Sequence, residues 1–275
     1  MNLFQNKSPL IKAALKQNQE IVNTLLFNLG HSIKPFYFQL VNKIRKVSIP
    51  PFITRIESMS FHRCISLCDI TIPPSVTYIG KYAFDSCSSI VEIEIPPSVA
   101  EMGKGAFNRC PKLTKISFSL KKIPDCAFEK CLGLSKFDVP PTVTEIGEYA
   151  FCSCTKLKEI NIPISVTYIG DYAFCLCSSL SHIEIPSSVT KINNYLFRGC
   201  KSLKNIIIPS SVTEIGKYAF DGCKSLNNIL IPSSVTQIGV FAFIGCESLN
   251  EIEMPNSIKD IEKLGISNNT KIIIK

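Results

Sequence analysis

The chain has 275 residues, of which 45% are hydrophobic, so it is long enough to bury a large core in one or two domains. Its net charge is +8, and residues 1–47 carry +6 of this charge. Residues 48–275 therefore carry only +2, which argues against a strongly basic nucleic-acid-binding surface there. Charged residues, prolines and asparagines interrupt every apolar run well before the roughly 20 residues of a membrane-spanning helix.

The N-terminal sequence predicts where the protein is located. Residues 1–17 contain no apolar stretch of signal-peptide length and no small-residue cleavage site. We therefore expect a cytoplasmic protein, with delivery to the cell surface by non-classical export as the alternative. A glycan at Asn268, which begins an Asn-Asn-Thr acceptor sequence, would favour that alternative, and Asn6 begins a second, weaker candidate.

Residues 8–26 predict two short antiparallel helices, with Asn18 in the turn between them. The segments 8–14 and 20–26 resemble one ankyrin repeat, although Ile11 replaces the usual histidine and no second copy follows. One ankyrin unit cannot bury its own apolar face, whereas the ends of a solenoid are usually covered by atypical sequence. We therefore expect a helical, ankyrin-like N-terminal cap.

Residues 33–46 mix aromatic and cationic side chains. We expect Phe36, Tyr37 and Phe38 to pack onto the following domain while the lysines remain solvated. Contact with an acidic membrane or with nucleic acid is the alternative. The predicted domains are residues 1–45, the cap with its basic linker, and residues 46–275, which contain repeats.

One phrase recurs along residues 46–275, and it reads Ile-x-Ile-Pro-x-Ser-Val-Thr-x-Ile-Gly-x-Tyr-Ala-Phe-x-x-Cys. Its phenylalanine returns every 23 residues, apart from one interval of 21, at Phe61, Phe84, Phe107, Phe128, Phe151, Phe174, Phe197, Phe220 and Phe243. A fixed period of this length is typical of a solenoid, in which each repeat is one coil that stacks on its neighbours.

Each coil predicts a short strand followed by a turn. Leu203, Ile206 and Ile208 alternate with polar or variable residues, so they should point inward, and stacked coils should align such strands in a parallel sheet. Proline then ends most strands because it lacks an amide hydrogen. The glycine at Gly216 and its equivalents is interpreted as a turn residue of positive φ. The cysteine three residues after each phenylalanine should be a small buried residue.

The strand pattern and the Ser-Val-Thr-x-Ile-Gly-x-Tyr-Ala-Phe-x-x-Cys phrase, read best at 208–223 and 231–246, resemble the BspA type of leucine-rich repeat. The resemblance covers about residues 44–275. It implies an α/β-type solenoid, a right-handed leucine-rich repeat horseshoe with a parallel β-sheet on its concave face. It also implies binding rather than catalysis, since members occur as cell-surface antigens and adhesins.

The positions between the inward strand residues should project from the concave face. They are Asp69/Thr71, Glu92/Glu94, Lys115/Ser117, Lys136/Asp138, Glu159/Asn161, His182/Glu184, Asn205/Ile207, Asn228/Leu230 and Glu251/Glu253. This set holds eight acids and two lysines, which favours a basic protein partner. Ile207 and Leu230 are adjacent and apolar, and we predict that they anchor a partner, rimmed by Asn205, Asn228, Glu184, Glu251 and Glu253. The alternative is that the apolar pair only supports the sheet.

The thirteen cysteines leave a second class of function open, a thiol-rich metal or redox protein. Cys152/Cys154 and Cys175/Cys177 form Cys-x-Cys pairs in adjacent coils, and four thiolates can hold zinc. Buried, packed thiols are the preferred interpretation, and disulfides are not expected in a reducing compartment.

Catalysis has little support in the sequence. His182 shares the predicted face with Glu159 and Glu184, but no Ser or Cys nucleophile is placed in a sharp turn beside it. We therefore predict a non-enzymatic protein-interaction scaffold without a cofactor. A BspA-like surface antigen or adhesin is the first alternative.

Overall fold

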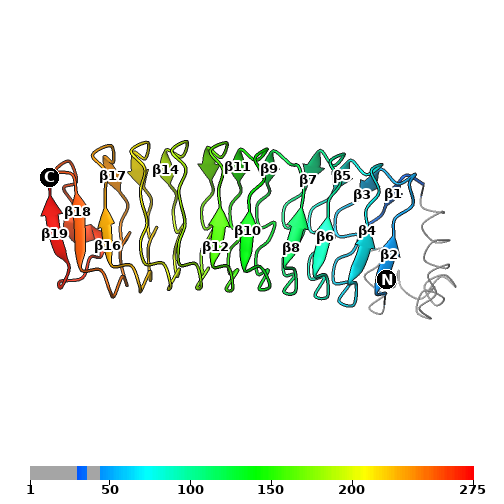
Figure 1. Ribbon diagram of the computed structural model, residues 1–275, viewed down its shortest axis with the longest axis horizontal. Coiled ribbons are helices and arrows are strands. Elements are labelled where there is room, and N and C mark those ends of the chain that lie inside the picture. Colours follow the sequence, from blue (N-terminus) through cyan, green and yellow to red (C-terminus); the bar gives the residue numbers. More distant parts are fainter. Residues whose placement is uncertain (1–29, 36–43) are drawn as a thin grey trace, which may run out of the picture. The chain divides into compact units, whose positions relative to one another are not determined.

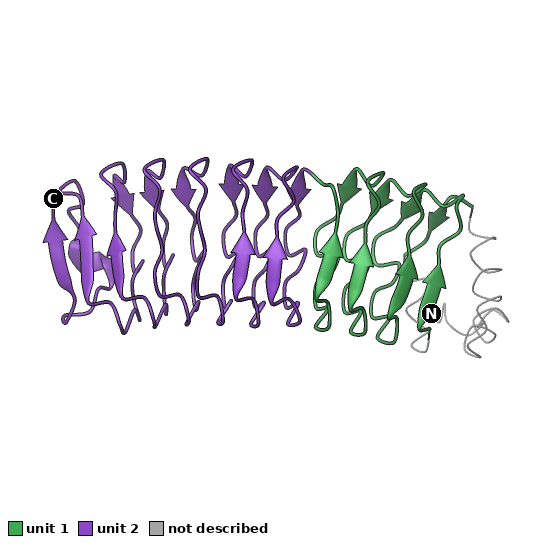
Figure 2. Ribbon diagram, viewed as in Figure 1, with its two compact units in different colours: residues 1–120 green, residues 121–275 purple. Residues whose placement is uncertain are grey.

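The computed structural model describes residues 30–35 and 44–275. These residues form stacked coils, and most coils contribute two short strands joined by turns (Figure 1). The chain divides into two compact units, residues 1–120 and residues 121–275 (Figure 2).

Unit 1 contains two sets of parallel strands. The two-residue strands β1 (Ser32–Ile33), β3 (Arg55–Ile56), β5 (Tyr78–Ile79) and β7 (Glu101–Met102) form one sheet in the order β1-β3-β5-β7. The three-residue strands pair as β2 (Lys46–Ser48) with β4 (Asp69–Thr71), and as β6 (Glu92–Glu94) with β8 (Lys115–Ser117). Lys46 is in register with Asp69, 23 residues later, so one repeat is one step of the stack.

Unit 2 repeats this arrangement. Its longer strands are β10 (Lys136–Asp138), β12 (Glu159–Asn161), β16 (Asn228–Leu230), β18 (Glu251–Met254) and β19 (Lys271–Ile274), and they pair as β10-β12 and β16-β18-β19. Its two-residue strands are β9 (Lys122–Ile123), β11 (Glu145–Ile146), β13 (Tyr168–Ile169), β14 (Lys191–Ile192), β15 (Glu214–Ile215) and β17 (Gln237–Ile238). They form the parallel sheets β13-β11-β9 and β14-β15-β17.

The predicted parallel solenoid is confirmed, but an α/β type is not supported. Within the described residues, the single helix is the short 3₁₀ helix η1 (Ile261–Leu264), because the return stroke of a coil is a second strand with turns. The predicted ankyrin-like helices at 8–26 lie outside the described residues. Ile33, placed in the basic linker by sequence, lies in β1 and is fully buried. The boundary at 45/46 stays a prediction.

The repeated phenylalanines fill the core. All nine are buried, and their rings stack on those of the neighbouring coils. In unit 1 the ring centroids of Phe84 lie 5.0 Å from Phe61 and 5.1 Å from Phe107. In unit 2 the distances between successive rings run from 5.4 Å to 5.9 Å. One aromatic ring per coil therefore forms a continuous column in each unit, which explains the fixed period.

The prediction of positive φ at the repeated glycine is wrong. Gly216 and its equivalents are absent from the residues of positive φ, which instead include Tyr218, two positions later. A Cβ on Gly216 would lie 2.6 Å from the backbone nitrogen of Asn194 in the preceding coil. Glycine is therefore required because two backbones approach closely at this position.

Asn193 occupies the glycine position in one coil, and the hydrogen bonding between coils differs there. The backbone N–H of Gly216 donates to the Ile192 carbonyl at 2.7 Å, whereas the Ile169 carbonyl receives the Asn193 side-chain amide. The sheet containing β13 ends at this step, and β14 begins another. The side-chain amide of Asn193 therefore donates to the carbonyl that the backbone N–H of a glycine would otherwise reach.

Candidate functional site

The residues predicted to project from the strands do so. We define the strand face as the outward side chains of the longer strands, together with the equivalent positions at 182–184 and 205–207. All of the predicted face residues are exposed, apart from Glu251 and Glu253, which are half-buried. The residues between them, such as Ile93 and Ile160, point into the core. The predicted alternation is thus confirmed.

The strand face is less acidic than the sequence predicted, because ion pairs join neighbouring coils. Lys46 Nζ lies 2.7 Å from Asp69, and Lys136 Nζ lies 3.1 Å from Glu159. Hydrogen bonds to these carboxylates raise the pKa of both lysines.

The same pairing occurs at the C-terminal strands. Lys271 pairs with Glu251 at 3.0 Å, and Lys275 pairs with Glu253 at 2.5 Å. Lys46 and Lys271 belong to β2 and β19, whose positions are not among the predicted face residues. Four of the eight predicted acids therefore have a lysine partner.

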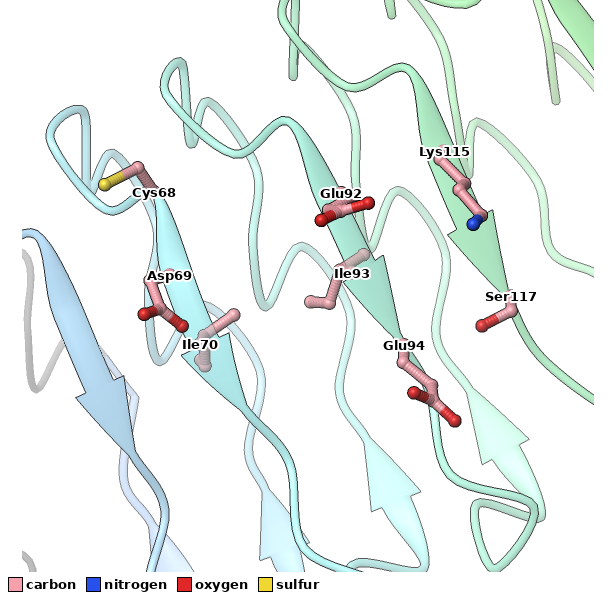
Figure 3. Close-up of a pocket in the computed structure, with 8 residues that line it drawn as sticks. All are labelled: Cys68, Asp69, Ile70, Glu92, Ile93, Glu94, Lys115 and Ser117. Atoms are coloured by element: carbon pink, nitrogen blue, oxygen red, sulfur yellow. The ribbon is translucent and has the colours of Figure 1, made fainter.

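Glu92 and Glu94 line a shallow depression on unit 1. It has a volume of about 500 Å³ and is formed by β4, β6 and β8, from which Asp69, Glu92, Glu94, Lys115 and Ser117 project (Figure 3). These two glutamates belong to a different unit from Ile207 and Leu230. The sequence prediction placed all of them in one site, and that grouping stays a prediction.

An apolar patch lies on unit 2, and we define it as Ile207 and Leu230 of the strand face together with Ile164, which follows β12. These are the most exposed large hydrophobic side chains of the described residues, at 65%, 77% and 55% respectively. Ile164 and Ile207 line one depression of about 400 Å³ with Glu184. Leu230 lines a second of about 280 Å³ with Glu253.

The structure brings the predicted rim together around this patch. Parallel bridges place Glu184 beside Ile207 and Asn205 beside Asn228. Strands β16 and β18 put Asn228 opposite Glu251 and Leu230 opposite Glu253. Seven of the nine predicted binding residues thus occupy neighbouring positions on three consecutive coils and the bridged position before them.

Sequence reasoning missed Ile164. It follows the strand-ending Pro163, at a position where the next three coils have Ser187, Ser210 and Ser233. An apolar residue replacing serine at a fixed repeat position was the available signal. It was overlooked because only the strand positions were assigned to the face.

The predicted burial of the cysteine ladder is confirmed, and the structure adds a reason for it. The thiol of Cys200 donates a hydrogen bond to the Phe174 carbonyl of the preceding coil at 3.2 Å, and Cys87, Cys110, Cys154, Cys177, Cys223 and Cys246 do the same at 3.1–3.2 Å. Burial raises the pKa of Cys64 and of Cys246 to about 12. Each such cysteine is a small core residue that also links two coils.

The zinc hypothesis does not fit the two Cys-x-Cys pairs. Cys154 and Cys177 donate to the carbonyls of Phe128 and Phe151, whereas Cys152 and Cys175 hydrogen-bond to each other. Across residues 30–35 and 44–275, no three His, Cys, Asp or Glu side chains are placed to hold a metal ion. Cys152 and Cys175 therefore form one pair, while Cys154 and Cys177 each bond to a separate backbone carbonyl.

A buried ionic cluster in unit 1 was not foreseen. Asp85 is almost completely buried and receives two hydrogen bonds from the Arg109 guanidinium, at 3.1 and 3.2 Å. His62 Nδ1 lies 2.9 Å from the same carboxylate. These residues come from three successive coils, so the cluster joins them. His182, in contrast, is exposed on the strand face.

The comparison with known proteins agrees with the coil geometry. The model of the BspA type leucine rich repeat region matches six copies, over residues 31–158 and 144–273. The chain belongs to the BspA type leucine-rich repeat family. The family model describes a repeat region, and no curated protein matches the chain.

Solved leucine-rich repeat proteins resemble the chain over most of its length. A leucine-rich repeat protein from Bacteroides ovatus is 24% identical, with 89% of this chain and 87% of that chain covered and a TM-score of 0.49. The Leucine Rich Repeat protein of T. pallidum is 26% identical, with 84% and 88% covered and a TM-score of 0.49. A leucine rich cell surface protein from Faecalibacterium prausnitzii is 24% identical, with 84% and 88% covered and a TM-score of 0.47.

No helix in the described part of the chain is both long enough and apolar enough to cross a membrane.

Proposed function

We propose that this protein is a non-enzymatic scaffold that binds a protein partner on the strand face of unit 2. The observation that carries the proposal is the apolar patch. Its three side chains are the most exposed large hydrophobic residues described, and they occur where the surrounding face positions are mostly polar. Exposed apolar side chains with a polar rim are typical of protein-binding sites.

Burial of the exposed side chains of the patch would contribute a modest free energy to partner binding. Covering a largely exposed Ile or Leu contributes about 1.5–3 kcal/mol when the side chain becomes fully buried. Ile207 and Leu230 project from a backbone held by stacked coils, which keeps the ordering cost of binding low. Both side chains therefore have the exposure and the rigid support that a binding anchor requires.

The charge around the patch favours a partner with a basic group. Glu184 lines the same depression as Ile207, next to the exposed His182 on the same strand segment. Glu251 and Glu253 are already paired with lysines, so they attract a cation less than their number suggests. We therefore propose that a partner Lys or Arg lies beside Glu184 while apolar side chains cover Ile207 and Leu230.

The test is affinity capture with matched baits. The double variant Ile207→Ser/Leu230→Ser should lose proteins that the unchanged chain and an Ile65→Ser control retain. Ile65 is exposed but belongs to unit 1, so its replacement controls for surface hydrophobicity. Circular dichroism should show unchanged folds. Equal capture by all three baits would refute the proposed site.

A second candidate function is that of a BspA-like surface antigen or adhesin. Asn268 is exposed within its acceptor sequence, while the Thr270 hydroxyl donates to the Leu249 carbonyl at 2.7 Å. Labelling intact cells with a membrane-impermeant reagent distinguishes the two candidates. Labelled protein would support the surface role, and unlabelled protein would support a scaffold inside the cell.

A further inference from the structure

Three cysteines of unit 2 stand outside the buried cysteine ladder, and two of them, Cys152 and Cys175, occupy equivalent positions in adjacent coils. The residue that directly follows the core phenylalanine forms a row along the coils, which we call the outer row: Glu129, Cys152, Cys175, Arg198, Asp221 and Ile244. Three of its six members are charged, so the two cysteines are not required there by the packing that fixes the ladder.

The backbone brings these two cysteines into register on adjacent coils. Lys130 N–H donates to the Cys152 carbonyl at 2.8 Å, and Ser153 N–H donates to the Cys175 carbonyl at 2.7 Å. Backbones that are hydrogen-bonded in this way lie about 4.8 Å apart. A disulfide requires a Cα separation of about 4.4–6.8 Å, so the spacing permits one.

In each Cys-x-Cys segment, the two cysteines lie on opposite sides of a turn and have different surroundings. Ser153 and Leu176 have φ values of 61° and 59°. Cys154 and Cys177 on one side of these turns are completely buried and bonded to phenylalanine carbonyls. Cys152 and Cys175 remain 8% and 3% exposed, and their thiols share a hydrogen bond.

The neighbouring groups make the two thiols unequal. The hydrogen bond from Cys175 lowers the pKa of Cys152, and the charge of Lys130 acts in the same direction. The pKa of Cys175 is raised, chiefly by the same bond. One sulfur is therefore the better nucleophile, while the other keeps its proton.

We propose that Cys152 and Cys175 form a reversible oxidation site, at which hydrogen peroxide or another hydroperoxide joins two adjacent coils through a disulfide. The Cys152 thiolate attacks a peroxide oxygen, the O–O bond breaks, and a sulfenic acid forms while hydroxide leaves. The Cys175 sulfur then attacks the Cys152 sulfur, and the displaced hydroxide leaves as water. Two thiols lose two electrons, and hydrogen peroxide becomes two molecules of water.

The site differs from the ladder thiols and from Cys68 in its hydrogen-bond partner, which is a second thiol. The ladder thiols donate their hydrogen bonds to backbone carbonyls instead. Cys68 is half-buried and its thiol donates to the Arg45 carbonyl at 3.4 Å. Oxidation of Cys68 would therefore give a sulfenic acid rather than a disulfide. Peroxide is small enough to reach a thiol of low exposure, whereas bulky reagents are not.

The experiment is peptide mapping of the full chain after peroxide treatment, with free thiols blocked before digestion. Trypsin releases residues 137–156, which contain Cys152, and residues 159–191, which contain Cys175. We expect these peptides to be cross-linked, with a combined mass lower by two hydrogen atoms, and to separate after treatment with a dithiol reductant.

Matched variants assign the sulfur atoms, because the same peptides also contain Cys154 and Cys177. The cross-link should be lost in Cys152→Ser and in Cys175→Ser, and it should persist in Cys68→Ser. Far-UV circular dichroism and melting curves check that each variant folds. A chain that gains only oxygen atoms, or a cross-link that persists in both serine variants of the pair, would overturn the proposal.

Discussion

The close approach at Gly216 makes a quantitative prediction. A methyl group on this residue would lie 2.6 Å from the Asn194 nitrogen and 2.8 Å from the Asn193 carbonyl carbon, both of which are backbone atoms. The coils would have to separate by about 0.8 Å to reach ordinary contact at 3.4 Å. Overpacking of this kind costs about 1–3 kcal/mol, and a weakened Gly216–Ile192 backbone hydrogen bond adds about 1 kcal/mol.

The matched control is Gly222, which has the opposite combination of properties. Its φ is +69°, but the nearest atom to an added Cβ is 3.8 Å away. Gly222→Ala should therefore cost only the penalty for left-handed backbone, about 1–2 kcal/mol. Gly216→Ala should cost about 2–4 kcal/mol, the sum of its two effects.

Urea denaturation of the two variants, together with hydrogen exchange of residues near 192–216, measures both effects. Local exchange matters because repeat proteins need not unfold in one step. Gly216→Ala should increase exchange on both sides of the affected step. If it is no more destabilising than Gly222→Ala, the close-approach explanation of the repeated glycine is wrong.

Two further predictions concern the core. Phe174→Ala removes a ring that stacks on Phe151 at 5.7 Å and on Phe197 at 5.9 Å, and it should cost about 3–5 kcal/mol in urea denaturation; a loss below about 1 kcal/mol would contradict the importance of the column. The alkaline limit of stability follows from the ladder thiols, because burial raises the pKa of Cys64 and Cys246 from 9.0 to about 12. Folding therefore gains stability below pH 9 that disappears as the pH rises towards 12, by about 1.4 kcal/mol per thiol and pH unit. Melting temperatures from pH 7 to pH 11 should fall steeply above pH 9, and less steeply in Cys246→Ala; a flat profile would exclude this linkage.

The sequence was sufficient for the features that repeat with a fixed phase. The period of the phenylalanines and the alternation around Ile206 and Ile208 have one simple structural solution, stacked coils with parallel strands. The burial of the cysteines followed from the same phase. These features depend on spacing along the chain, which is directly visible.

Features that depend on contacts between coils could not be derived in the same way. A glycine needed for close approach looks the same in a sequence as a glycine needed for positive φ, so Gly216 was assigned the wrong reason. The charge of the strand face was overestimated because Lys46 and Lys271 lie in strands that match the phrase incompletely. Ile164 was missed because it follows the strand rather than lying within it.

Long backbone hydrogen bonds on the strand side of the coils have a consequence for the apolar patch. Between the coil that carries Ile164 and the coil that carries Ile207, the backbone hydrogen bonds from Ser181 to Lys158 and from Lys204 to Ser181 lengthen to 3.3 and 3.5 Å. The following steps, from Asn227 and Asn250, return to 3.1 and 2.8 Å. Where neighbouring repeats are coupled weakly, they open locally at lower free energy than the rest of the array. A partner that contacts both Ile164 and Ile207 would therefore also suppress this local opening. Its affinity would be reduced by the free energy needed to keep these coils stacked.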